Sequence, residues 1–266
     1  MAHVIERPLA QPVGPVVVHK VAALAPLAWL GAGWRDLAQA KAFGVGVGTL
    51  VAVAGWLLIF AARDAAYAVP ALLGGFLLVA PLGAIALYEV SAQIEDGVPL
   101  DANLAWGAWH RNAGAIGMLG LLQALALLAW ERLSALIFAL FLGDLTPHVD
   151  NLWRELLFSG NYTALLLAFF GSGALLAALV FALSVVTAPM LMDEPVDVVT
   201  AMLTSWRCCM KNPAAMVVWA ALITGLTALG MAGLLMGLIV VFPWLGHASW
   251  HAYRDLVEVR SGGPAA

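Results

Sequence analysis

Long apolar stretches separated by short clusters of charged residues make up most of the chain. Residues 42–62, 65–88, 112–130, 156–192 and 212–253 carry no Asp, Glu, Lys or Arg. A helix needs about 20 apolar residues to cross the hydrocarbon core of a bilayer, which is about 30 Å thick. The pattern therefore predicts several membrane-spanning helices.

The last uncharged stretch is too long for one crossing, because as a single helix it would extend about 63 Å. Gly230 and Gly233 predict a tight turn that divides it in two. The expected fold is all-α, a polytopic transmembrane helical bundle with six spans. The spans are expected at residues 43–62, 68–88, 113–130 (helical on to 142), 161–189, 213–229 and 233–253.

The distribution of Lys and Arg predicts that both termini lie in the cytoplasm. With six spans, nine of these residues fall on one side of the membrane and three on the other. The cytoplasmic side is the one enriched in Lys and Arg. Five spans would move Arg254 and Arg260 across and weaken the asymmetry. The expected organisation is a cytoplasmic tail at 1–23, a six-span membrane domain at 24–257 and a cytoplasmic tail at 258–266.

Three segments on the predicted cytoplasmic side have the pattern of amphipathic helices lying in the membrane interface. The clearest carries an apolar stripe at intervals of three or four residues, with polar residues opposite. Its stripe consists of Val198, Val199, Met202, Leu203, Trp206 and Met210. Leu27, Leu30, Trp34 and Leu37 form a similar stripe near the N-terminus, and Leu100, Leu104, Ala108 and Trp109 form a weaker one.

These short helices predict an internal repeat. Trp106 and Asn112 match Trp206 and Asn212 at an offset of 100 residues, and the two asparagines are expected to cap the helices that follow. Each short helix precedes an outward span and an inward span. The inward spans each carry a late proline, at Pro81, Pro189 and Pro243. The sequence thus predicts three quasi-repeats of an interfacial helix plus a helical hairpin.

Composition excludes several classes of protein. Hydrophobic residues make up 63% of the 266 positions and charged residues only 11%, whereas soluble domains average about 25% charged. The formal net charge of −4 argues against nucleic acid as a partner. The two cysteines, Cys208 and Cys209, are adjacent, which excludes a disulfide-stapled scaffold.

Five stretches, at residues 29–36, 189–193, 201–206, 212–213 and 243–255, carry a family resemblance. They resemble one bacterial family of predicted six-helix integral membrane proteins of unknown function, in which some members carry a cytochrome c oxidase subunit I label. The resemblance runs from about residue 25 to 257. It implies a multi-pass protein of the bacterial inner membrane and no established activity. Residues 193–212 are also similar, more weakly, to six-helix domains beside some bacterial glycerophosphodiesterases. The most specific part of the resemblance to the first family is the stretch 243–255.

The histidines bear on the oxidase label. An oxidase subunit I needs six histidines within the membrane, and here only His110, His247 and His251 approach a common end. His247 and His251 lie four residues apart on one helix face, which makes them weak candidates for a metal site. The alternative interpretation is an amphipathic belt in the headgroup region, and we expect no cofactor.

No motif for a catalytic nucleophile, a phosphate-binding loop or a zinc protease is present, and no catalytic residue is predicted. The favoured function is a non-enzymatic scaffold, assembly or lipid-interacting module. A passive carrier or channel for a small amphipathic molecule is the alternative, and a redox protein using His247 and His251 is the third hypothesis. An acidic group near the cytoplasmic face could bind a protein partner or be a solvated surface. Its members are Glu89, Glu95, Asp96, Asp101, Asp193, Glu194 and Asp197.

Overall fold

The computed structural model describes residues 14–61, 80–142, 160 and 162–259, and this part of the chain is almost entirely helical. The predicted all-α class is confirmed, with one short antiparallel pair of strands as an addition. The helices are α1 (Ala25–Gln39), α2 (Lys41–Ala61), α4 (Ile85–Glu95), α5 (Ala102–Gly107), η2 (Ala108–His110), α6 (Ala113–Leu142), α8 (Thr163–Ser184), α9 (Thr187–Asp193), α10 (Val198–Lys211), α11 (Pro213–Ala232) and α12 (Leu238–Leu256). The strands are β1 (Val16–Val18) and β2 (Val257–Val259).

Four stretches of helix in the described residues are long and apolar enough to cross a membrane: Lys41–Ala61, Ala113–Phe141, Thr163–Asp193 and Pro213–Ala232. They match four of the six predicted spans. Of the predicted span 68–88, residues 68–79 lie outside the described part of the chain. The predicted span 233–253 overlaps α12. This helix has 19 residues but is not one of the four apolar stretches.

The predicted break in the last apolar stretch is present, slightly later than expected. α11 continues to Ala232, and α12 begins only at Leu238. Between them Leu234 and Leu235 have positive φ angles of 54° and 64°. This left-handed conformation cannot continue a right-handed helix, so it separates the two helices.

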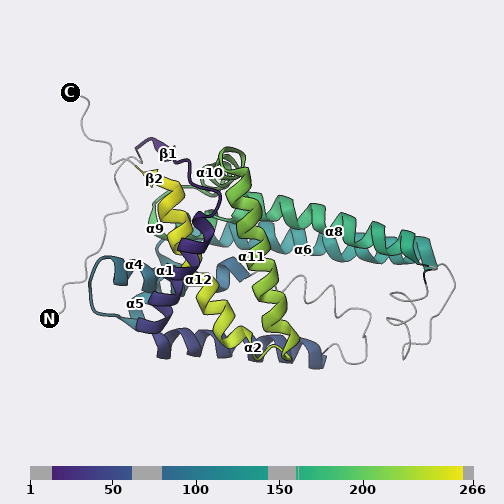
Figure 1. Cartoon of the computed structure of the whole chain (residues 1–266), viewed down its shortest axis with the longest axis horizontal. Coiled ribbons are helices and arrows are strands. Elements are labelled where there is room, and N and C mark those ends of the chain that lie inside the picture. Colours follow the sequence, from purple (N-terminus) through teal and green to yellow (C-terminus); the bar gives the residue numbers. More distant parts are fainter. Residues whose placement is uncertain (1–13, 62–79, 143–159, 161, 260–266) are drawn as a thin grey trace.

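The candidate spans present many apolar side chains to their surroundings. α6 and α8 run side by side and extend away from the other helices, while α2 lies along another edge of the molecule (Figure 1). In water such a surface would drive association, whereas hydrocarbon chains solvate it. Exposed examples are Leu50, Leu57, Leu121, Leu125, Leu128, Leu167, Leu175, Val217 and Leu229.

The core lies where α4, α9 and α12 meet. α4, α9 and α12 contact one another pairwise, and Ile85, Leu87, Met190 and Leu191 are fully buried there. Close approach at this junction depends on glycine, because a Cβ on Gly246 would lie 2.6 Å from Leu87 Cδ1. The middle of the molecule is therefore closely packed.

Each of the short helices α1, α5 and α10 packs against one of these three core helices. α1 contacts α12, α5 contacts α4, and α10 contacts α9. α1 and α12 approach most closely at Gly33, where an added Cβ would overlap the backbone of Ala248. Gly48 of α2 meets Ile239 of α12 in the same way, which agrees with a packing role for glycine in a membrane helix.

The two ends of the described chain meet. β1 and β2 form an antiparallel pair in which Val17 lies opposite Glu258, and the backbone N–H of His19 donates to the carbonyl of Leu256 at 2.8 Å. Nζ of Lys211 on α10 donates to the carbonyl of Val18 at 2.7 Å. The segment before α1, the end of α12 and the end of α10 therefore form one assembly.

The capping role expected for Asn212 is wrong. Asn212 makes no side-chain cap at α11; instead its Oδ1 accepts from the N–H of Val21 and its Nδ2 donates to the carbonyl of His19, both at 2.9 Å. Asn112 Nδ2 similarly donates to the carbonyl of Val196 at 2.8 Å. Each asparagine thus connects the end of one short helix to the segment that leads into another.

Aspartates begin two of the short helices instead. Asp101 accepts from two backbone N–H groups of α5, and Asp197 does the same in α10. A hydrogen bond from the Thr200 hydroxyl lowers the pKa of Asp197 and keeps the cap ionised. α4 is followed by Gly97, which has φ +67°, and the N–H of Val98 bonds to the carbonyl of Gln93.

Candidate functional site

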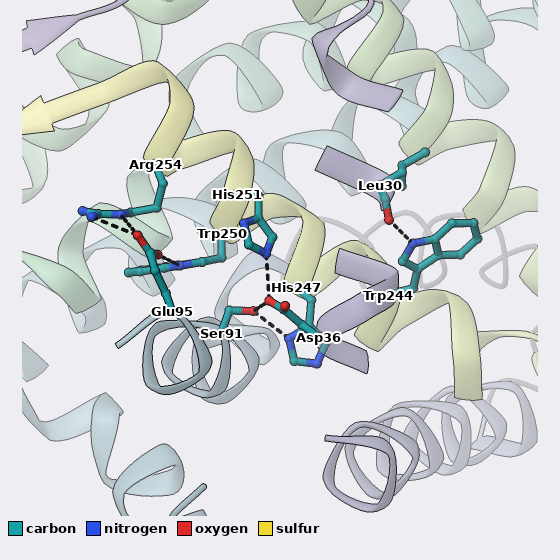
Figure 2. Close-up of polar contacts among 9 residues, drawn as sticks. All are labelled: Leu30, Asp36, Ser91, Glu95, Trp244, His247, Trp250, His251 and Arg254. Atoms are coloured by element: carbon teal, nitrogen blue, oxygen red, sulfur yellow. Dashed lines mark hydrogen bonds and ion pairs between the residues drawn. The ribbon is translucent and has the colours of Figure 1, made fainter. Parts of the chain in front are cut away.

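A chain of polar side chains crosses the apolar junction of α1, α4 and α12. Figure 2 shows His251 and Ser91 both reaching Asp36, and Ser91 also reaching His247. His251 Nε2 lies 2.8 Å from Asp36 Oδ2, Ser91 Oγ lies 2.7 Å from the same oxygen, and Ser91 Oγ lies 2.8 Å from His247 Nδ1. Three helices distant in the sequence are joined by four side chains.

The hydrogen bonds fix the tautomer of His247. The single hydroxyl proton of Ser91 is donated to the Asp36 carboxylate, so the Ser91 oxygen is left to accept. His247 must then carry its proton on Nδ1 and donate it to Ser91. Its Nε2 has only a lone pair.

That Nε2 atom is buried and has no hydrogen-bond partner within the described residues. It faces α2 near Gly44, where an added Cβ would lie 3.9 Å away. Leu37 and Pro243 line the same spot. A neutral imidazole whose Nδ1–H donates to a carboxylate-linked acceptor is the arrangement that orients a histidine ligand, although a single nitrogen makes only one bond to a metal.

Ser, His and Asp in contact do not make a hydrolytic triad here. In such a triad histidine bridges the serine and the carboxylate and removes the serine proton. Here Ser91 is the bridge, and its proton points to Asp36. Ser91 is also fully buried, so the arrangement is suited to holding helices together.

The two histidines predicted as weak metal candidates are both in this chain, but they do not converge on one point. His251 Nε2 binds Asp36, while His247 Nε2 is directed toward α2. Among the residues that the structure describes, no group of three or more His, Cys, Asp or Glu side chains could hold a metal ion. Sequence reasoning missed Asp36 and Ser91, because each is one of several polar residues in a short helix and no motif distinguishes it.

The predicted acidic group divides between buried and exposed side chains. Glu89 is 3% exposed and pairs with Arg111, which also approaches Met192 Sδ at 3.6 Å. Glu95 accepts from Trp250 Nε1 at 2.8 Å and pairs with Arg254 (Figure 2). Glu95, Asp96, Asp101 and Asp197 are exposed. Glu89 and Glu95 are therefore bound by other side chains of this protein.

Arg254 of α12 joins α4 and α9. It lies 3.1 Å from Glu95 of α4 and 3.8 Å from Asp193 of α9, and Tyr253 donates to Asp193 at 3.0 Å. Partial burial lowers the pKa of Arg254, but the two carboxylates outweigh it and raise the pKa overall. The ends of α4, α9 and α12 are thus held together by charge.

α10 presents a second candidate site on the surface. Its small and polar side faces the core through Ala201, Ser205 and Cys208. Its apolar stripe faces outward, with Val199, Leu203, Trp206 and Met210 all exposed. Next to the end of this stripe lies an open groove of about 620 Å³.

Comparison with known families gives one match. Residues 68–193 match the family described as "Predicted integral membrane protein (DUF2189)". No curated protein and no solved structure matches the chain significantly. The match confirms the resemblance to a family of predicted integral membrane proteins, and the oxidase label is not part of it.

The DUF2189 match divides the polar chain. Ser91 and the Glu89–Arg111 pair lie inside it, whereas Asp36, His247 and His251 lie outside, as does the stretch 243–255 that carried the resemblance most specifically. The chain is a predicted integral membrane protein of unknown function with several apolar helices.

Proposed function

We propose that this protein is a non-enzymatic, lipid-interacting structural module of the bacterial inner membrane. The observation that carries the proposal is the orientation of α10, whose apolar stripe faces outward while its polar and small residues pack inward. A helix that exposes leucine, tryptophan and methionine beside Arg and Lys suits the boundary between acyl chains and headgroups.

Contacts between chain segments support six spans. β1 and α10 touch, so they lie on one side of the membrane. Three candidate spans separate them. An odd number of crossings would put β1 and α10 on opposite sides, so the contact between them calls for one more crossing.

The same reasoning applies after α10. β2 pairs with β1 and therefore shares its side, yet only α11 among the candidate spans lies between α10 and β2. α12 supplies the missing crossing. Its polar residues His247 and His251 face the neighbouring helices α1 and α4, and polar groups inside a membrane protein are placed in that way.

The contacts also favour the threefold repeat. Each short helix packs on the second helix of the preceding hairpin in cyclic order: α5 on α4, α10 on α9, and α1 on α12. Each carries an exposed tryptophan seven residues before the next long helix, at Trp34, Trp106 and Trp206. We infer three units around the junction of α4, α9 and α12, with the short helices and both termini on the cytoplasmic side.

Two alternatives remain for comparison. A passive carrier would need a path between α4, α9 and α12, where Leu87, Met190 and Leu191 are instead closely packed.

A redox function has one observation in its favour, which is that Nε2 of His247 has no hydrogen-bond partner among the described residues. A visible absorption band in protein purified from its own membranes, lost in His247→Ala, would support the redox alternative.

The proposal can be tested by spin labels on α10. In a background with Cys208 and Cys209 replaced by alanine, a nitroxide at Leu203→Cys should be relaxed more by oxygen than by a water-soluble nickel complex in lipid vesicles. A label at Arg207→Cys, on the adjacent face, should show the reverse. Preferential relaxation by the nickel complex at both positions would show that the stripe faces water and would overturn the proposal. Low accessibility to both reagents at Leu203→Cys would favour a protein partner on the stripe.

A further inference from the structure

The groove beside α10 combines two cations with an apolar wall. It is lined by the whole of β1 and by Arg207, Met210 and Lys211 from the last turn and a half of α10. Its volume, about 620 Å³, is in the range of small-molecule sites. It lies where the end of α10 meets the paired strands (Figure 1).

Both cations have donors available for an anion. Arg207 is exposed and has no ion pair in the described part of the chain. Lys211 uses one donor on the carbonyl of Val18 and has two more. A guanidinium beside an ammonium suits a phosphate, because the first binds two oxygens in a fixed geometry and the second adds a point charge.

No acidic side chain of the described residues lines the groove. Glu258, across the strands from Val17, contacts His19 at 3.0 Å. Asp197 is at the opposite end of α10, where it caps the helix. The groove therefore keeps a positive character.

The apolar wall is continuous with the exposed stripe. Met210 belongs to both, and Trp206 and Leu203 follow it along the same face of α10. A ligand that fills both surfaces has an anionic head and an apolar tail. We propose that the groove binds the phosphate headgroup of an anionic phospholipid, with its acyl chains along the α10 stripe; this inference rests on the lipid-interacting function proposed above.

Native mass spectrometry of the full-length protein in detergent tests the site. Phosphatidylglycerol and phosphatidylcholine of equal chain length are titrated as competitors. The wild type should retain phosphatidylglycerol preferentially, and Arg207→Gln should lower that preference about fivefold, the contribution of one cation near an anionic lipid. Arg207→Lys should retain most of it.

Arg35→Gln is the matched control. Arg35 follows the exposed Trp34 of α1 just as Arg207 follows Trp206 of α10, and it is exposed, but it does not line the groove. Its loss should leave the lipid preference unchanged. An equal effect of both variants, or no preference in the wild type, would overturn the site.

Free phosphate is tested separately. Inorganic phosphate at the concentration of the lipid should not displace phosphatidylglycerol, and Met210→Ser should weaken lipid retention. Displacement by phosphate alone would make the occupant a soluble anion and overturn the lipid. These outcomes differ from failure of the proposed function, because Arg207→Gln should leave the nitroxide at position 203 in the lipid phase.

Discussion

At the scale of single residues, Asp36 links three helices through buried polar contacts. It is 5% exposed and is the shared acceptor for Ser91 and His251. A carboxylate in an apolar junction is stable only while its partners remain, and the partners likewise need it. The same residue connects α1 to both α4 and α12.

We expect Asp36→Ala to lower the free energy of unfolding by about 3 kcal/mol, because it leaves the Ser91 hydroxyl and the His251 ring without an acceptor. Thermal unfolding in a fixed detergent measures the change. Glu131→Gln is the control: Glu131 is half exposed beside Arg132, and its loss should cost less than about 0.5 kcal/mol. Equal effects of the two variants would contradict a structural role for Asp36.

The adjacent cysteines give a second prediction at this scale. Burial raises the pKa of the Cys208 thiol to about 12 and that of Cys209 to about 11. Because the thiolate is the reactive form, both should resist iodoacetamide at pH 8 in the folded protein and react once it is unfolded in SDS. Reactivity should rise only as the pH approaches these values. Arg207→Cys, at the exposed neighbouring position on the polar face, should add one rapidly modified thiol. Rapid modification of the native pair at pH 8 would contradict their burial.

At the scale of helices, hydropathy predicted the elements well and their contacts poorly. Local rules of length and backbone conformation account for four spans, the break after α11 and the end of α4 at Gly97. They do not predict that Asp36 and Ser91 are buried, because the face of α1 that is buried depends on α12, more than 200 residues away. The apolar stripe of α10 was predicted correctly, but an amphipathic pattern alone cannot show that the polar side packs against protein.

The crossing of α1 and α12 can be tested with two glycines of α1. Gly33→Ala would place a methyl group against the backbone of Ala248, so it should lower the free energy of unfolding by about 2 kcal/mol. Gly31→Ala, where nothing lies within 4 Å, should instead raise it by up to about 1 kcal/mol through helix propensity. Thermal unfolding again measures both. Stabilisation by Gly33→Ala would show that the two helices are not in close contact.

At the scale of the whole molecule, the paired ends and the cyclic packing describe one architecture. Asn112 and Asn212 each reach from one short helix to the segment entering the next unit, at Val196 and His19 respectively. The equivalent position in the first unit is Ala40, which is buried without a polar side chain. Two of the three junctions therefore use the same hydrogen bond, as expected if the units arose from a common pattern and then diverged.

The number of crossings gives the last prediction. With six spans, Lys20 and the turn at Val98 lie on one side of the membrane, and the turn at Met236 lies on the other. With only the four candidate spans, Lys20 and Met236 would share a side and Val98 would lie opposite. Single cysteines at these three exposed positions can be labelled with an impermeant maleimide in right-side-out and inverted vesicles. We expect Lys20→Cys and Val98→Cys to react in inverted vesicles and Met236→Cys in right-side-out vesicles. Joint labelling of Lys20→Cys and Met236→Cys would refute the six-span arrangement, and with it the threefold repeat, since each unit requires a complete hairpin.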